Sequence, residues 1–417
     1  MSKFTPTPIK RIGRVVTGKT PSTAIADNFD GEFMFVTPTE LHTDFMIECS
    51  EKTLTRRGLD SILTNSVKGL SIAVGCIGWD MGNVALINEE CATNQQINSV
   101  TDINTDEYNP YYLYYWLLTK KAYLFQISTV TRTPILNKTT FEDVLVPLPS
   151  KAIQDRVASV LLPISRRIAL NNAINNELEK AAKLIYDYWF MQFDFPNAEG
   201  KPYRASGGVM EYNVHLKREI PKGWRVVPLS EIITENKLTV PEETDKTDMF
   251  GLDLSIMPSD TMCLNQRGNA EDFDSNRFKL SRYDLLFGSI RPYLRKAGFS
   301  AFDGVVNGTI MNFKSKIEQD YSFALCTLTG EELFQYADTR SRGNGTRMPT
   351  INATELLEYT FAYDRTTASE FNKQVSQYWK MISDNINQNF ELIALRDFLL
   401  PLLMNGQVTV KPEEAHR

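Results

Sequence analysis

Residues 157–185 (VASVLLPISRRIALNNAINNELEKAAKLI) and 371–399 (FNKQVSQYWKMISDNINQNFELIALRDFL) share one pattern of apolar and polar residues. In each stretch, apolar residues or asparagines recur every seven positions, and a second set follows four positions after each. This spacing places both sets on one face of an α-helix and is typical of a coiled coil. The positions singled out on this face of the first stretch are Val157, Ile164, Asn171, Asn175, Leu178 and Ile185. The matching positions of the second are Phe371, Tyr378, Asn385, Asn389, Leu392 and Leu399.

Asparagine occupies the same two places in both stretches. A buried asparagine in a helix seam lowers stability but selects the register and the partner. Its repetition therefore predicts that the two helices pair with each other, and antiparallel pairing gives a pseudo-twofold internal repeat. The alternative is two unrelated amphipathic helices.

The repeat extends into the sequence before each helix. Residues 131–134 (TRTP) return as 346–349 (TRMP), and Asn94 returns as Asn307. Short apolar runs before each helix predict strands, bounded by turn residues. These runs are 33–36, 69–74, 84–87, 284–287 and 304–311, and residues 111–119 are predicted to be helical. The expected fold class is α+β, with two mixed α/β domains separated by two long antiparallel coiled-coil helices.

The segment rich in glycine, proline and charge after the first helix is predicted to be a linker. The expected division of the chain is a first mixed domain at 1–150, a first long helix at 151–192, a linker at 193–222, a second mixed domain at 223–365, a second long helix at 366–408 and a tail at 409–417.

Composition excludes several classes of protein. The 417 residues are 42% apolar and 23% charged, which is typical of globular domains. No apolar run approaches the roughly 20 residues of a membrane span, and no secretory signal is visible, so we expect no membrane contact and a cytoplasmic location. Five scattered cysteines and three scattered histidines offer no spacing suited to a metal site or a catalytic triad. We therefore predict no metal-binding and no catalytic residues.

Two motifs leave an enzyme open as the alternative. Residues 13–20 (GRVVTGKT) match the P-loop pattern, although neither a buried strand before them nor a helix after them is predicted. Residues 109–112 (NPYY) approach the Asn-Pro-Pro-Tyr motif of adenine methyltransferases but lack its second proline. The alternative function is thus a P-loop NTPase or a divergent DNA methyltransferase.

Local clusters of basic residues contrast with the net charge of −6. Residues 267–296 contain seven basic and four acidic residues, and three further arginines lie in 340–347 with no acid between them. Arginines in glycine-rich loops suit contact with phosphates and with guanine edges. A solvated charged face is the alternative for any one of them.

The middle of the chain carries the most specific motifs. It resembles the conserved region of the specificity subunits of Type I restriction-modification systems in 184–190 (LIYDYWF), 193–196 (FDFP), 199–203 (EGKPY), 206–208 (SGG) and 220–224 (IPKGW). Further matches are 18–21 (GKTP), 92–97 (ATNQQI) and 146–149 (VPLP). The second half departs from the pattern, because 361–364 (FAYD) replaces the Pro-x-Pro turn.

The resemblance implies a non-catalytic subunit with two target-recognition domains, each recognising one half of a bipartite site on double-stranded DNA. It implies two methyltransferase (modification) subunits bound to the helices, with restriction and translocase subunits bound through them. S-adenosylmethionine, ATP and magnesium would then belong to the partner subunits, and this chain would hold no cofactor. The candidate DNA contacts are Lys19, Thr20, Arg56, Arg57, Lys68, Asn94, Gln95, Arg132, Arg267, Arg291, Arg295, Lys296, Arg340, Arg342 and Arg347.

Apolar residues surround the ends of both helices and exceed what one helix seam can cover. We expect part of this surface to contact a methyltransferase subunit, and the alternative is that it caps the adjacent recognition domain. The candidate interface residues are Tyr186, Trp189, Phe190, Leu402 and Leu403.

Overall fold

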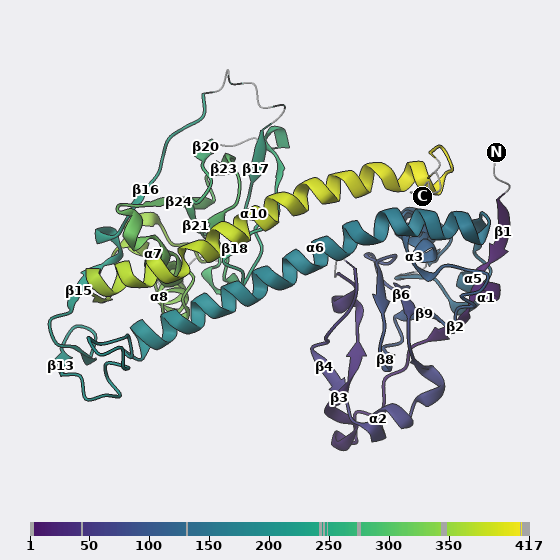
Figure 1. Cartoon of the computed structure of the whole chain (residues 1–417), viewed down its shortest axis with the longest axis horizontal. Helices are drawn as coiled ribbons and strands as arrows, with labels where there is room; N and C mark the ends of the chain where they lie inside the picture. Colours follow the sequence, from purple (N-terminus) through teal and green to yellow (C-terminus); the bar gives the residue numbers. More distant parts are fainter. Residues whose placement is uncertain are drawn as a thin grey trace, which may run out of the picture. The chain divides into compact units, whose positions relative to one another are not determined.

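The computed structural model describes residues 4–42, 45–130, 132–241, 244, 247, 249–272, 277–342, 348–408 and 410. The chain forms two compact units (Figure 1). Unit 1 comprises residues 1–170 and 389–417, and unit 2 comprises residues 171–388. Both long helices contribute to both units, and unit 1 is therefore built from two separate stretches of sequence, whereas unit 2 is one continuous stretch.

Unit 1 contains two four-stranded sheets. The first, with order β2-β9-β6-β7, is antiparallel throughout and consists of β2 (Arg14–Thr17), β9 (Ile97–Thr101), β6 (Ser71–Gly75) and β7 (Val84–Ile87). The second, with order β4-β3-β8-β5, consists of β4 (Lys52–Leu54), β3 (Phe29–Val36), β8 (Cys91–Thr93) and β5 (Ser66–Val67). Helix α3 (Pro110–Leu118) is apolar on nearly every side, and its buried aromatic residues complete the core beside the first sheet.

Unit 2 repeats this plan with one strand added. Its first sheet has the order β16-β24-β21-β22-β18, made of β16 (Ile233–Glu235), β24 (Ile310–Ser315), β21 (Leu285–Gly288), β22 (Ala297–Ser300) and β18 (Cys263–Leu264). Its second has the order β19-β17-β23-β20, made of β19 (Gly268–Asn269), β17 (Phe250–Leu252), β23 (Gly304–Asn307) and β20 (Arg277–Leu280). The single strand expected at 304–311 is therefore two strands of different sheets, because a turn at Gly308 and Thr309 separates them.

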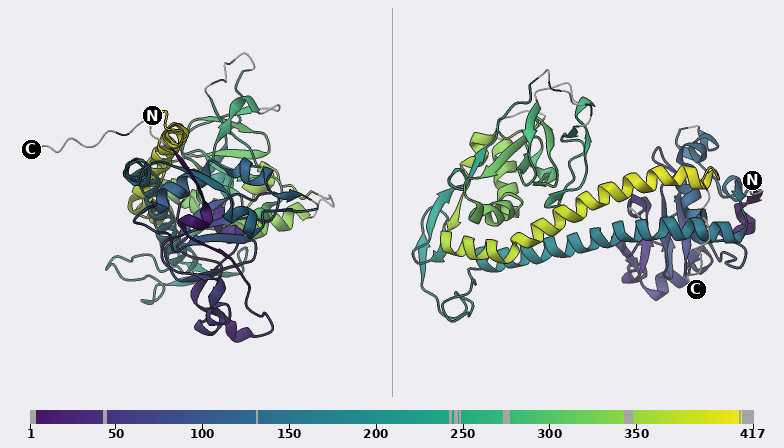
Figure 2. Two further views of the ribbon diagram at one scale, coloured as in Figure 1. Left: turned by 90° about the vertical axis from the view of Figure 1, so that its right-hand side faces the viewer. Right: turned by 45° about the horizontal axis from the view of Figure 1, so that its top comes forward.

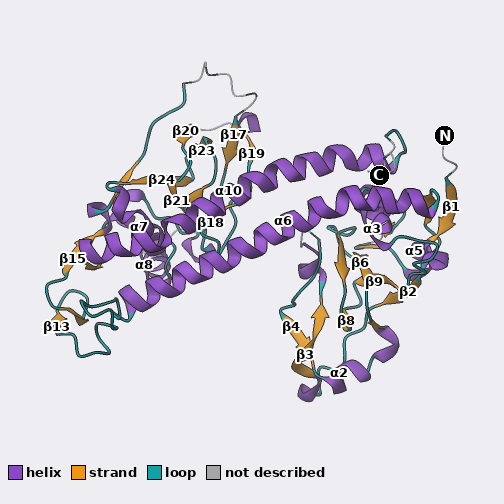
Figure 3. Ribbon diagram, in the orientation of Figure 1, coloured by secondary structure: helices purple, strands orange, loops and turns teal. Residues whose placement is uncertain are grey.

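Shorter elements complete both units, and Figure 3 shows how strands and helices alternate. Those of unit 1 are β1 (Thr5–Pro8), β10 (Thr129–Val130), β11 (Pro134–Ile135), β12 (Leu145–Leu148), α1 (Ile9–Ile12), α2 (Arg56–Asp60), α4 (Lys121–Gln126) and α5 (Lys138–Glu142). Those of unit 2 are β13 (Met210–Asn213), β14 (Arg218–Pro221), β15 (Arg225–Pro228), β25 (Thr360–Tyr363), α7 (Tyr321–Leu328), α8 (Glu331–Arg342) and α9 (Ala353–Leu357). The α+β fold class with an internal repeat is confirmed.

The long helices are α6 (Lys151–Tyr186) and α10 (Arg365–Met404), which continue through Pro163 and Pro401 (Figure 2). In unit 1, the beginning of α6 packs with the end of α10, and Val157 and Leu400 share one apolar core. In unit 2, the end of α6 packs with the beginning of α10, where Tyr186 lies 6.1 Å from Phe371 between ring centroids. The helices therefore pair in antiparallel sense in each unit.

Asparagine side chains meet between the two helices within unit 2. The amide of Asn385 donates a hydrogen bond of 2.9 Å to Asn175, and the amide of Asn171 donates one of 2.9 Å to Gln388. Asn171 and Asn175 are buried. A buried amide needs a polar partner, so these contacts fix the register of the two helices here.

The aromatic end of α6 is covered by unit 2 itself, which corrects one expectation. Trp189 and Phe190 lie in a π-helical turn, η4 (Asp187–Met191), and both are buried. The ring of Phe190 lies 4.7 Å from that of Phe323, and the hydroxyl of the buried Tyr186 is 3.0 Å from that of Thr327. These residues cap the mixed domain of unit 2 because its helix α7 supplies the apolar surface that they need.

The corresponding end of α10 is largely covered as well. Leu403 is buried in the core of unit 1, and Leu402 is half-buried. A partner would therefore need a different apolar surface on the helices.

The segment 193–222, expected to be a linker, contains the antiparallel hairpin of β13 and β14. Within the same segment, Phe195 stacks on Tyr203 with 4.7 Å between ring centroids.

Polar contacts hold the mixed domain of unit 2 to both helices. On α6, the Glu179 carboxylate accepts hydrogen bonds of 3.1 Å from the N–H groups of Met262 and Cys263. On α10, Ser383 and Asp384 accept hydrogen bonds of 2.7 and 2.5 Å from Arg282. Burial raises the pKa of Glu179, and the two N–H donors oppose that shift only in part.

The raised pKa predicts a pH-dependent effect of replacing Glu179 with glutamine. A carboxyl group whose pKa is higher in the folded state costs stability as the pH rises from about its unfolded value, near 4.3, through the folded pKa. The glutamine of Glu179→Gln has no proton to lose in this range. The free energy of unfolding of this variant, relative to that of the wild type, should therefore increase from about pH 4.5 upward. Glu179→Ala should instead cost about 1–3 kcal/mol, because two donors lose their acceptor.

Urea unfolding of the wild type and both variants between pH 4.5 and 8 measures these differences. A constant difference between Glu179→Gln and the wild type across this range would contradict the prediction.

Candidate nucleic-acid interface

One edge of the first sheet of unit 1 gathers several candidate residues. Strand β2 ends at Thr17, β9 begins at Ile97, β6 ends at Gly75 and β7 begins at Val84. Because neighbouring strands are antiparallel, these four ends lie at the same edge. We call this edge, with the loops that leave it, the loop edge of unit 1.

Direct contacts join the loops of this edge. The N–H of Gly18 donates to Ile97 at 3.0 Å, and the hydroxyl of Thr20 donates to the Gln95 side chain at 2.9 Å. A Cβ on Gly18 would lie 2.1 Å from the carbonyl oxygen of Asn94, so only glycine permits this approach. Lys19, Thr20 and Gln95 are thereby brought together, whereas the Asn94 amide is bonded within its own loop to Gln96 at 3.0 Å.

The loop that carries Arg132 joins the same edge. The N–H of Gly78 donates to the carbonyl of Pro134 at 3.0 Å, and Ile77 forms a β-bridge with Ile135. Arg132 is exposed. This loop edge therefore presents cations and amides from three separate loops.

Three other candidates of the first half lie away from this edge. Lys68 precedes β6 and thus lies at the opposite end of that strand. Arg56 and Arg57 belong to α2, where Arg56 forms an ion pair of 3.1 Å with Glu90 and Arg57 one of 3.3 Å with Asp27.

Unit 2 has an equivalent loop edge. Strand β16 ends at Glu235, β24 begins at Ile310, β21 ends at Gly288 and β22 begins at Ala297. The bridge between Ile290 and Thr350 corresponds to the bridge between Ile77 and Ile135.

Lys237 follows β16 by two residues, as Lys19 follows β2, and it is not among the residues predicted from the sequence. Its ammonium group lies 2.9 Å from the Glu235 carboxylate. A hollow at this edge is lined in part by Asn236, Lys237, Ser289 and Thr350.

The most similar loops of the two edges are 76–83 (CIGWDMGN) and 289–296 (SIRPYLRK). Both join antiparallel strands of the first sheet, and both have positive φ at their third and seventh residues. Unit 1 has glycine there, Gly78 at 106° and Gly82 at 91°, whereas unit 2 has Arg291 at 51° and Arg295 at 56°. A left-handed non-glycine residue is strained by roughly 1–2 kcal/mol. Arginine at these positions therefore indicates that its side chain is needed.

The two arginines serve different purposes. Arg295 is bound to Asp260 and Glu331, and its guanidinium lies 4.8 Å from the centre of the Phe334 ring, which makes it part of the packing of unit 2. Arg291 is exposed, and no carboxylate in the described part of the chain pairs with it. Arg291 is thus available to an external ligand.

Other candidates in unit 2 have structural contacts. Lys296 donates to the Leu254 carbonyl at 2.6 Å, and Arg267 lies 3.6 Å above the ring of Phe250 with a pKa that burial lowers. Arg340 lies 3.5 Å from Glu358, and Arg342 lies 2.7 Å from Asp338. Arg347 lies outside the described residues.

The P-loop pattern does not form a phosphate-binding loop. Residues 14–17 of the motif are strand β2, and the next helical turn after Thr20 is a short 3₁₀ turn at Ala26–Asn28. A P-loop needs a strand before its glycines and a helix directly after its lysine.

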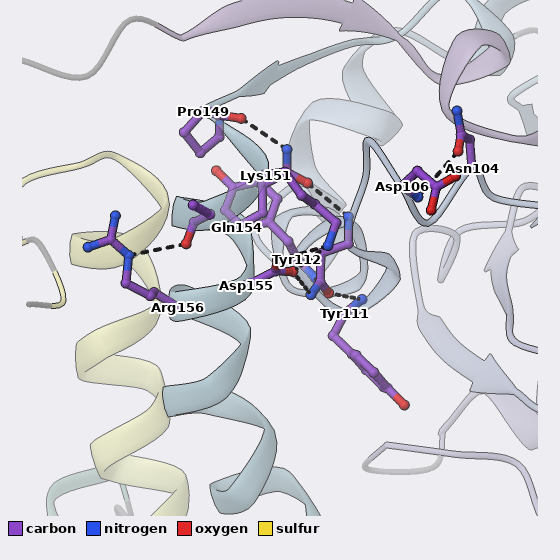
Figure 4. A network of polar contacts seen from close by, with 11 residues as sticks. Asn104, Asp106, Tyr111, Tyr112, Pro149, Lys151, Gln154, Asp155 and Arg156 are labelled. Atoms are coloured by element: carbon purple, nitrogen blue, oxygen red, sulfur yellow. Dashed lines mark hydrogen bonds and ion pairs between the residues drawn. The ribbon is translucent and has the colours of Figure 1, made fainter. Parts of the chain in front are cut away.

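Asn109 of the methyltransferase-like motif has a structural role, and its partners Tyr111, Tyr112 and Asp155 lie close together in Figure 4. Its side chain caps α3 by accepting hydrogen bonds from the N–H groups of Tyr111 and Tyr112, and its amide donates to Asp155 of α6 at 2.7 Å.

The described residues include no cluster of three or more His, Cys, Asp or Glu suited to a metal ion. Across the same residues, no helix has the length and apolar character of a membrane span.

Comparisons with known proteins give one consistent family. Residues 1–180 match the family described as the Type I restriction modification DNA specificity domain. The chain is 27% identical to the MjaIX Type I restriction enzyme specificity subunit of Methanocaldococcus jannaschii over 97% of this chain and 93% of that protein. It is 30% identical to the HindI specificity subunit of Haemophilus influenzae over 40% of this chain and 36% of that protein. The S subunit of a Type-I restriction-modification system from M. genitalium has the same fold, with a TM-score of 0.60 and 13% identity over 96% of both chains.

The strain at Arg291 predicts a stabilising substitution. Arg291→Gly should raise the free energy of unfolding by about 0.5–1 kcal/mol, because glycine adopts positive φ without a Cβ clash. Arg295→Gly offers a matched comparison, since it relieves the same strain but removes two ion pairs and a ring contact. That variant should be less stable than Arg291→Gly, as measured by urea unfolding. An Arg291→Gly variant less stable than the wild type would refute the interpretation.

Proposed function

We propose that this chain, which belongs to the family of Type I restriction-modification specificity subunits, recognises a bipartite and asymmetric DNA site and has no active site of its own. Its target-recognition domains would be residues 1–150 and 223–365, with 151–192 and 366–408 as the conserved helices, 193–222 as the segment between them and 409–417 as a tail.

The observation that carries the proposal is the repeated loop edge. Both edges have the same strand ends and loops with positive φ at the same two places, but they present different side chains. A common backbone with different side chains suits two sites that differ in base sequence, because bases are recognised by side chains placed in the grooves. Each loop edge would recognise one half-site.

The distribution of charge supports DNA binding that this chain shares with its partner subunits. The net charge is −6, while exposed cations gather at the loop edges. Phosphate neutralisation dominates affinity for DNA, so the subunit alone should bind weakly and with strong salt dependence. Partner subunits would supply the remaining cations.

We further propose two methyltransferase subunits as direct partners, with restriction and translocase subunits bound through them. S-adenosylmethionine and ATP with magnesium would be held by these partners, and the complex would work in the cytoplasm. Binding of S-adenosylmethionine or ATP by the isolated chain would favour the enzyme alternative instead.

The two-edge proposal predicts that Arg291→Ala affects one half-site alone. Loss of a bidentate base contact costs about 1–3 kcal/mol, so methylation should lose its base preference in the second half-site and keep it in the first. Sequencing of modified bases in cells that carry the complex measures both halves at once.

A matched control is Arg225→Ala. Arg225 begins β15, away from the loop edge, and its 2.6 Å ion pair with Glu231 is exposed. This variant should leave the methylated sequence unchanged. A continuous palindrome in the wild type, or equal changes in both half-sites of Arg291→Ala, would contradict the proposal.

Exposed apolar residues on the helices identify a new candidate for the partner surface. Leu184 on α6 and Phe398 on α10 are equivalent in the internal repeat, and their side chains are 70% and 66% exposed. Because the same exposed feature occurs once in each repeat, it suits one partner bound in two copies.

Replacing these two residues should therefore remove partner copies one at a time. Leu184→Ala or Phe398→Ala alone should give complexes with one methyltransferase subunit, and the double variant should bind neither firmly, as measured by native mass spectrometry. Met381→Ala is the control, since Met381 is exposed on α10 but its repeat counterpart is Arg167. Two bound subunits in the double variant would exclude this surface.

A further inference from the structure

The loop 76–83 of unit 1 carries a tryptophan in water. Trp79 is 71% exposed, although tryptophan gains more from burial than almost any other residue. A single exposed apolar side chain is common on proteins and would need no explanation. The surroundings of Trp79 distinguish it from that case.

The residues around Trp79 hold its loop in a fixed position, and the Trp79 ring itself lies 6.1 Å from that of Phe125 between ring centroids. The Asp80 carboxylate accepts hydrogen bonds of 2.6 Å from Lys121 and 3.0 Å from Asn83, and Lys121 also donates to Asn83 at 2.7 Å. Met81 is buried, and Gly82 packs against Lys121 so closely that an added Cβ would lie 2.9 Å from its side chain. The flanking residues anchor the loop, so Trp79 is presented without a further loss of backbone freedom.

The neighbours of Trp79 are suited to a polyanion. The loop belongs to the same edge as Lys19, Gln95 and Arg132, and its N–H group at Gly78 is bonded to the Arg132 loop. Within the described ranges, neither Lys19 nor Arg132 has a carboxylate partner. The acidic neighbour, Asp80, is already neutralised by Lys121. An exposed ring on the same loop edge as two cations without a carboxylate partner in the described ranges complements a duplex better than an apolar protein surface.

The second loop edge has a comparable feature. In the loop 289–296, Tyr293 is 48% exposed, one place after the position equivalent to Trp79. Each unit therefore presents an exposed aromatic ring from the same loop of the same edge.

We propose that Trp79 enters a groove of the DNA and packs against a base step of the first half-site, where it acts as a specificity-determining residue. This inference rests on the proposed function. An apolar ring placed between bases partly unstacks them, and pyrimidine–purine steps yield at the lowest cost. The first half-site should therefore contain a flexible TA or CA/TG step opposite Trp79. Tyr293 would have the same task in the second half-site.

The experiment is selection from a pool of random duplexes by the complex of this chain with its methyltransferase subunits. The variants are Trp79→Ala, Trp79→Phe and the control Tyr212→Ala, which removes a 65% exposed ring from the β13–β14 hairpin. For Trp79→Ala, we expect the flexible step to disappear from the first half-site while the second half-site is unchanged. Affinity for the wild-type sequence should fall about tenfold, with Trp79→Phe between the two.

Each of the following outcomes contradicts either the inference alone or the proposed function as well. If Trp79→Ala selects the wild-type motif with wild-type affinity, or if Tyr212→Ala gives the same loss, the inference is wrong although the proposed function stands. If Trp79→Ala fails to bind methyltransferase subunits in the absence of DNA, the ring belongs to a protein interface and the inference is also wrong. If the wild-type complex selects no motif, the proposed function is wrong, and the inference that rests on it is wrong as well.

Discussion

The antiparallel pairing of α6 and α10 is the interaction on which the rest of the chain depends. Each unit uses the beginning of one helix and the end of the other, so neither core is complete with a single helix. The hydrogen bond between Asn175 and Asn385 gives this pairing a register that leucine packing alone would not impose. From that register follow the placement of Glu179 beside Met262 and of Asp384 beside Arg282, and through them the seating of the mixed domain of unit 2.

The two loop edges show how one backbone plan can carry different sets of side chains. Antiparallel pairing brings four strand ends to one edge regardless of the sequence of the loops. The loops can then differ in sequence, but each needs a positive φ at two positions. Gly78 adopts a positive φ without strain, whereas Arg291 adopts it with backbone strain. A strained residue with an unpaired charge is a stronger sign of function than either property alone.

The sequence predicted the helices well because a heptad pattern is local and spans about eight helical turns in each stretch. It predicted both β6 and β7 closely, but not which strands pair, since strand order depends on contacts between distant residues. The sequence does not distinguish Arg291 from Arg295. Only the structure shows that Asp260 and Glu331 pair with Arg295, whereas Arg291 is exposed. Lys237 was missed because insertions shift it away from the offset that relates the other repeated residues. Trp189 was misjudged because an apolar helix end gives no indication of which surface covers it.

The composition of unit 1 from both ends of the chain has a consequence for synthesis on the ribosome. All of unit 2 is made by residue 388, whereas the core of unit 1 still lacks Leu400, Leu403 and Met404. The domain that is translated first is therefore the last to be completed, and the apolar core around Val157 and Leu161 stays partly uncovered until the end of α10 emerges. During that interval the nascent chain exposes a surface that chaperones bind and that promotes aggregation.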